Sequence, residues 1–440
     1  MKKQQIKKIA ATALVAFSVT LLPTPALAVS TNIVSETEGK TTLTMSQIQD
    51  LAAIYNRNNE SFELQQDILE LNKTTTRNSR RSLQDAINNA GMSGESGGLD
   101  TLGTTLENMK KDPSFNPLDP GYIALEMQYN TMKSSMAAAQ AQQMASVDAM
   151  IEQLQTINGA LDDLDVATED LEKSMSDWQK EVRLVAEKLC LNYAQLEKTI
   201  ALTKQQVALA EKAAAITEVQ EKLGMAVTTD MVSAQSNLLE AQNSLAGLEE
   251  SLTMLKRQIN LMIGRNMGSP LEITNIMAPP IAIEPAPPYT EALIDHFIDK
   301  NYELKTLERT KADYKDTDLT DLGSDERQAL DQDIKATDLQ ITTKKETIEN
   351  NLKSLLAKID SDGKAYQIAR DKYVNEKKLF EFTKLKYERG MISQLEFMQA
   401  ELALNSAELQ WMQAGYAYHN DWQKYNALQE GITLTAYDAM

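Results

Sequence analysis

The stretch "KYERGMISQLEFMQAEL" at residues 386–402 has helix-forming residues on both sides of a single glycine, Gly390. Glycine takes the left-handed backbone conformation with less strain than other residues, and that conformation commonly ends a helix. After the glycine, Ser393 and Glu396 form the S-x-x-E pattern of a capping box, which begins a new helix. The stretch therefore predicts a helix, a tight turn at Gly390 and a second helix.

A similar stretch, "EKLGMAVTTDMVSAQSNLLEAQ", lies earlier in the chain at 221–242. Aligning Gly224 with the later glycine also aligns the methionines that follow them. We predict a second turn at Gly224, followed by a helix that Thr228 or Thr229 caps together with Asp230. One such hairpin fits an ordinary structural turn, whereas a matched pair favours a repeated element with a function.

The N-terminal 28 residues have the pattern of a secretory signal peptide. Four lysines precede the apolar run "IAATALVAFSVTLL", and "ALA" at 26–28 is a small-residue cleavage site. Removal of the four lysines changes the net charge of −19 to −23 (−19 − 4), so nucleic acid is not expected as a main partner. No later run is long and apolar enough to predict a transmembrane helix.

Residues that carry chemistry are scarce. Cys190 is the only cysteine, which excludes an intrachain disulfide, and His296 and His419 are the only histidines. Motifs such as H-E-x-x-H, C-x-x-C, G-x-S-x-G and the P-loop do not occur. We therefore predict a protein that is not an enzyme and that needs no cofactor or metal.

Prolines divide the chain into tandem halves. After the signal they occur only at 113–120 and 270–288, so the intervening stretches are free to form long helices. The Pro-rich segment 267–289 is predicted to be an extended linker. It separates a first helical repeat, 29–266, from a second, 290–432, and residues 433–440 form a tail.

The halves share an order of elements. An opening helix (44–72 and 289–314) is followed by a polar break (88–121 and 315–326), a long helix, the Gly-Met turn and a return helix. Gly159 is a candidate break in the first long helix. Apolar residues step by three and four along both long helices, as in coiled coils, so the fold class is all-α. The two seams are Val182, Val185, Leu189, Tyr193, Leu196, Ile200 and Val207, and Ile348, Leu352, Leu355, Ile359, Tyr366, Ala369 and Tyr373.

These features resemble the TolC-type outer-membrane efflux channel family. "LKYERGMISQLEFMQAEL" is similar to that family's R-Y-x-x-G-x-x-S-x-x-D-x-L-x-A-x repeat signature, and "EKLGMAVTTDMVSAQSNL" is similar to its first copy. "NRNNESFEL" and "IDKNYEL" look like the N-x-E-L segment that opens each family half. The resemblance covers most of residues 43–432.

The resemblance implies a homotrimer in which each protomer gives two hairpins to a hollow α-helical barrel. Such a barrel is a passive tunnel, and its hairpin tips dock a periplasmic adaptor (membrane fusion) protein joined to an inner-membrane pump. By this resemblance, Asp230, Tyr387 and Glu396 match gate positions at the entrance. The docking tips would be Gly224, Met225, Ala226, Gly390, Met391 and Ile392.

One feature departs from the family, which inserts membrane strands between its helices. Each strand needs ~9–11 residues of alternating pattern. The break at 315–326 is too short and too polar for two, and the first-half break does not alternate. We expect β-barrel strands to be absent or rudimentary, and membrane association to occur through partners. The chain is expected in the cell envelope, at the outer membrane by resemblance. The alternative function is a cell-surface coiled-coil scaffold that binds proteins without transport.

Overall fold

The computed structural model describes residues 41–90, 97–111, 116–117, 119–279, 283–317, 323–432 and 434–438. The predicted signal peptide at 1–28 lies outside this described part. Most of the described residues are helical, which confirms the all-α fold class. The helices are α2 (Met45–Tyr55), α3 (Arg57–Ala90), α4 (Gly97–Lys110), α5 (Pro120–Lys222), α6 (Thr228–Met262), α7 (Glu291–Lys300), α8 (Tyr302–Asp316), α9 (Ser324–Glu388), α10 (Gln394–Gln429) and α11 (Thr435–Asp438). Strands β1 (Thr42–Thr44) and β2 (Glu272–Thr274) pair in parallel.

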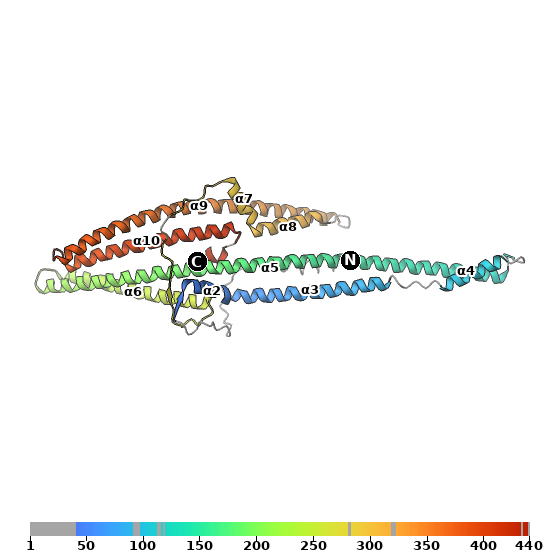
Figure 1. Ribbon diagram of the computed structural model, residues 1–440, viewed down its shortest axis with the longest axis horizontal. Coiled ribbons are helices and arrows are strands. Elements are labelled where there is room, and N and C mark those ends of the chain that lie inside the picture. Colours follow the sequence, from blue (N-terminus) through green and yellow to red (C-terminus); the bar gives the residue numbers. More distant parts are fainter. Residues whose placement is uncertain are drawn as a thin grey trace. The chain divides into compact units, whose positions relative to one another are not determined.

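The described residues divide into two compact units. Unit 2 comprises residues 57–176, and unit 1 comprises the described residues up to Asn56 and from Asp177 onward. Both predicted hairpins, α5–α6 and α9–α10, have their turns in unit 1 (Figure 1). The boundaries that we predicted for the tandem repeats stay a prediction.

In unit 1, α5 and α10 run antiparallel. Lys198 of α5 lies 2.5 Å from Glu408 of α10, and Asn405 donates to Gln205 at 2.8 Å. Contacts therefore move toward the start of α10 as they move toward the end of α5. This register brings the α5–α6 turn and the α9–α10 turn to the same end of the unit (Figure 1).

The core of unit 1 follows the predicted seams. Along α5 the residues from Val182 to Ile200 at three- and four-residue steps are buried or half-buried, and along α9 Leu352, Leu355, Ile359 and Tyr366 are buried. Most of them belong to two apolar clusters, one around α5, α6 and the strands and one around α7, α9 and α10. Burial of apolar surface is the main favourable term in folding, so these seams hold the helices together.

The Pro-rich segment, predicted to be an extended linker, packs against α10 as a strap. Part of it is β2, and beyond the strand the Tyr416 hydroxyl donates to the Met277 carbonyl at 2.9 Å. The Tyr418 hydroxyl accepts from the Glu284 amide at 2.9 Å and donates to its carbonyl at 2.8 Å. A Cβ at Gly415 would lie 2.6 Å from Pro279, so only a glycine lets the strap approach α10 this closely.

Three local predictions need correction. Gly159 does not interrupt α5, because a helix glycine with open space around it lowers propensity without blocking the backbone. The first-half break at 88–121 contains helix α4, in which Leu99, Leu102 and Leu106 lie on one face. At the break at 315–326, α8 continues to Asp316 and α9 begins at Ser324, whereas residues 318–322 lie outside the described part.

Both opening helices also divide at an asparagine, which we did not predict. Asn56 separates α2 from α3, and Asn301 separates α7 from α8 with similar extended dihedrals. The Asn301 side chain accepts from the Leu304 amide at 2.9 Å and so caps α8. In the second half, the N-x-E-L segment is therefore the start of a helix.

Candidate functional site: the two hairpin tips

Both predicted turns form at the predicted glycines. Gly224 has a φ of 74° and Gly390 a φ of 68°. The Met225 amide donates to the Gln220 carbonyl at 2.7 Å, and the Met391 amide donates to the Lys386 carbonyl at 2.8 Å. Each glycine amide donates in turn to a carbonyl three residues back, so both helices end in the same Schellman motif.

The helices that leave the turns begin differently. At the second tip, Ser393 and Glu396 form the predicted capping box, because the Glu396 amide donates to the Ser393 hydroxyl and the Ser393 amide donates to the Glu396 carboxylate. At the first tip the capping position is Val227. Its amide donates to Asp230 at 3.4 Å, so the prediction of Thr228 or Thr229 as the cap is wrong. Of the two hydrogen bonds of a capping box, this helix has the one from the backbone amide of Val227 to the side chain of Asp230.

The tips present apolar side chains to solvent. Met225 is 75% exposed and Met391 is 69% exposed, and Leu223 and Val227 beside the first turn are also exposed. A Cβ on Gly224 or Gly390 would meet nothing within 4 Å, so the turns are open on their outer side. The remaining tip residues, Ala226 and Ile392, are half-buried.

The predicted gate residues have defined local contacts. Tyr387 stacks on Phe397 with ring centroids 4.6 Å apart and planes 15° apart. Hydrogen bonds from the amide and hydroxyl of Ser393 hold the pKa of Glu396 below its usual value. Asp230 is exposed on the other hairpin, and among the described residues no hydrogen bond joins it to Tyr387 or Glu396. Tyr387 and Glu396 therefore lie together at the end of the α9–α10 hairpin, whereas Asp230 lies on the α5–α6 hairpin.

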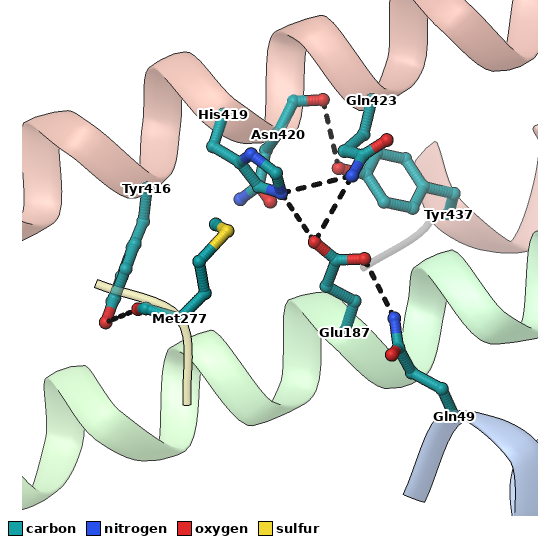
Figure 2. A network of polar contacts seen from close by, with 8 residues as sticks. All are labelled: Gln49, Glu187, Met277, Tyr416, His419, Asn420, Gln423 and Tyr437. Atoms are coloured by element: carbon teal, nitrogen blue, oxygen red, sulfur yellow. Dashed lines mark hydrogen bonds and ion pairs between the residues drawn. The ribbon is translucent and has the colours of Figure 1, made fainter. Parts of the chain in front are cut away.

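A buried polar network, absent from the sequence prediction, lies farther from the tips (Figure 2). Glu187 of α5 accepts from Gln49 of α2 at 2.9 Å, and its other oxygen lies 2.5 Å from His419 Nε2 of α10. Gln423 completes the network at 3.3 Å from Glu187. A buried carboxylate needs such partners, so the network holds three helices in register.

The C-terminal segment packs beside this network. The Tyr437 hydroxyl donates to the Asn420 carbonyl at 3.2 Å (Figure 2). The Tyr437 amide donates to Glu181 at 3.1 Å. The Lys188 ammonium donates to the Tyr437 carbonyl at 3.0 Å, and burial lowers the pKa of Lys188. Burial also raises the pKa of the Cys190 thiol to about 12, so this thiol stays protonated at neutral pH.

In the part of the chain that the structure describes, no helix is both long and apolar enough to cross a bilayer. No group of three or more His, Cys, Asp or Glu side chains among these residues is placed to hold a metal ion.

No family model and no curated protein matches the chain. Solved structures of membrane proteins, several of them outer-membrane proteins, are similar to it. A membrane protein from Pseudomonas aeruginosa is 10% identical, with 88% of this chain and 93% of that chain covered and a TM-score of 0.44. The outer membrane channel CmeC of Campylobacter jejuni is 11% identical (65% and 69% covered, TM-score 0.41), and the outer membrane protein VceC of Vibrio cholerae is 12% identical (62% and 75% covered, TM-score 0.39).

Proposed function

We propose that the chain is the passive tunnel component of an export or efflux assembly in the cell envelope. In this proposal its two hairpin tips dock a periplasmic-type adaptor protein, which is joined to an inner-membrane pump. The proposed location is the outer membrane side of the envelope. The observation that carries the proposal is the pair of matching turns with exposed apolar side chains at one end of unit 1.

The turns suit docking because their backbone is held while their side chains are free. The Schellman hydrogen bonds fix the backbone of the glycine turns. Little further conformational entropy of the backbone is therefore lost there when a partner binds. Exposed methionines such as Met225 and Met391 adapt to an apolar partner surface. An amphipathic helical hairpin on the adaptor protein would present an apolar stripe for such a surface to cover.

Exposed apolar side chains on the hairpin helices support assembly with further copies of the chain. Single exposed apolar residues are ordinary, but several along one hairpin favour burial against a partner. We propose a homotrimer, following the family resemblance. The exposed residues are Val232, Leu239 and Met254 on α6, and Leu339, Ile368, Leu379 and Phe382 on α9.

We propose that Asp230, Tyr387 and Glu396 line the entrance of the tunnel. The low pKa of Glu396 favours its charged form at neutral pH. Tyr387 is stacked on Phe397, so its ring has a defined place within the hairpin. Aspartate and glutamate at the mouth would then give the entrance a negative charge, which attracts cations more than anions.

Photo-crosslinking in intact cells tests the docking role. A photoreactive phenylalanine at Met225 or at Met391 should capture the same adaptor protein, because both tips lie at one end of the unit. Ile368 is the matched control, since it is 71% exposed and apolar but lies on the helix shaft of α9. It should capture another copy of the chain instead.

Capture of unrelated surface proteins along the whole hairpin, with no preference for the tips, would favour the scaffold function. If neither Met225 nor Met391 crosslinks to another protein, the docking role is contradicted.

A further inference from the structure

Three arginines gather on one face of α3 in unit 2. Arg77, Arg80 and Arg81 have the three- and four-residue spacing that puts side chains side by side on a helix, and all three are exposed. They line a hollow of about 680 Å³ between α3 and α5. The other residues that line it are Gln84, Asn158, Leu161, Asp162 and Asp165.

None of the three guanidinium groups makes an ion pair or a hydrogen bond among the described residues, although two carboxylates line the same hollow. Asp165 is occupied by Lys73 at 2.9 Å, and this hydrogen-bonded lysine lowers the pKa of Asp165. Arg77 lies near enough to Asp165 to help lower the pKa of that carboxyl, after the larger effect of Lys73. Counting Lys73 with the three arginines against Asp162 and Asp165, the hollow and this lysine have a net charge of +2 (4 − 2) in a chain whose total is −19.

A second hollow, in unit 1, is also lined by cations, but each of these is paired with a carboxylate of the protein. That hollow is lined by Lys344, Lys358 and Lys424. Lys358 lies 2.7 Å from Asp421, Lys424 lies 2.7 Å from Asp438, and Lys344 pairs with Glu303. Each of these lysines is neutralised within the protein. Arg77, Arg80 and Arg81 have no such ion pair among the described residues, so their N–H donors are available to a ligand.

We propose that the hollow formed by Arg77, Arg80 and Arg81 binds a phosphate-bearing ligand. A guanidinium group offers two parallel N–H donors, which match two oxygens of a phosphate, and three such groups can satisfy its oxygens together. Gln84 and Asn158 add neutral amide donors at the wall. The phosphate belongs either to a lipid headgroup or to a soluble compound. This site goes beyond the tunnel function and does not depend on it.

Equilibrium binding to the full chain tests the site with two probes. These are inorganic pyrophosphate and vesicles of equal parts phosphatidylcholine and phosphatidylglycerol, with pure phosphatidylcholine vesicles as the neutral reference. The triple variant Arg77→Gln, Arg80→Gln, Arg81→Gln should lose at least about tenfold in affinity, since charge-assisted hydrogen bonds are among the strong ones. The single variant Arg80→Gln should lose less and guards against misfolding of the triple variant.

A matched control removes three positive charges elsewhere: Arg370→Gln, Lys377→Gln, Lys378→Gln, all exposed on α9. It should bind both probes as the unchanged protein does. Arginine-dependent binding of pyrophosphate, of the anionic vesicles or of both supports the site, and the pattern identifies the source of the phosphate. Absence of binding to both probes, an equal loss in the control, or binding of poly-glutamate with the same arginine dependence would overturn it.

Discussion

Gly224 and Gly390 occupy the left-handed region of the backbone at the tips of two hairpins, and their surroundings are open. The strain that a larger residue would meet there comes from the backbone alone. Tight packing is not involved, because an added Cβ would have no neighbour within 4 Å. The two positions therefore allow the turn to be disturbed without disturbing the core.

Replacing Gly390 with valine should destabilise the turn by about 1–2 kcal/mol, because a β-branched residue is strained in the left-handed conformation. Hydrogen exchange at the Met391 amide, which closes the turn, should speed up about tenfold or more. Gly247→Val is the control, since Gly247 lies inside α6 with an equally open surrounding. Unchanged exchange at Met391 in the Gly390 variant would show that the turn does not need glycine.

The buried carboxyl of Asp421 makes the stability of the fold depend on pH. Burial raises its pKa to about 6, the hydrogen bond from Lys358 opposes the rise, and Asp362 adds to it. A carboxyl whose folded-state pKa is raised stabilises the fold below its unfolded pKa of about 4, and this contribution is lost as the pH rises toward 6. The unfolding free energy of the wild type, relative to Asp421→Asn, should fall by roughly 1–3 kcal/mol over this window.

Chemical denaturation between pH 4 and pH 6 measures that difference. Asp360→Asn serves as the control, because Asp360 is exposed and pairs with Lys364 on the same helix. A difference between wild type and Asp421→Asn that stays constant or grows with pH would contradict the raised pKa.

At the scale of the elements, the strap that follows β2 crosses α10 where Gly415 leaves room. Gly415→Ala should destabilise the protein by about 1–3 kcal/mol, since the new methyl would lie 2.6 Å from Pro279 and 3.0 Å from Tyr366. Alanine favours a helix over glycine, so Gly247→Ala in α6 should stabilise by up to about 1 kcal/mol. Thermal unfolding separates the two effects by their sign. Stabilisation by both changes would mean that the strap is not packed on α10.

The sequence predicted those turns and helix caps that depend on residues only a few positions apart. Gly390 and Ser393 give a turn and a capping box within a few residues, and both formed as expected. At the first tip the polar threonines suggested a cap, but the backbone becomes helical one residue earlier and Asp230 reaches back to Val227. The division at Asn301 could have been predicted from the sequence, since asparagine strongly favours the position that begins a helix. In the structure its side chain accepts from the Leu304 amide.

The contacts that depend on distant parts of the chain could not be predicted. Glu187 and His419 are 232 residues apart, and neither has a motif around it that indicates the other. The parallel pairing of β1 with β2 joins residues equally remote in sequence, and three-residue strands leave no usable alternation. The gate assignments of Asp230, Tyr387 and Glu396 stay predictions, because they concern an entrance that several copies of the chain would form.

At the scale of the whole molecule, the exposed apolar residues of α6 and α9 predict self-association. Light scattering over a range of concentrations should give the mass of a homotrimer. Ile368→Glu should weaken the assembly at least about tenfold, because it places a charge where an apolar contact is expected. A monomer at all concentrations would contradict the proposed tunnel, and a dimer would favour the scaffold.

The most direct test of the docking role compares both tips at once. The partner is the protein that crosslinks to a photoreactive phenylalanine at Met391. Its binding affinity is measured for the wild-type chain and for the Gly224→Val, Gly390→Val and Gly247→Val variants. Both tip variants should lose affinity at least about tenfold, since a strained turn no longer holds the docking side chains in place, whereas Gly247→Val should bind as the wild type does. Full affinity in both tip variants would contradict the docking role and make the tips ordinary structural turns.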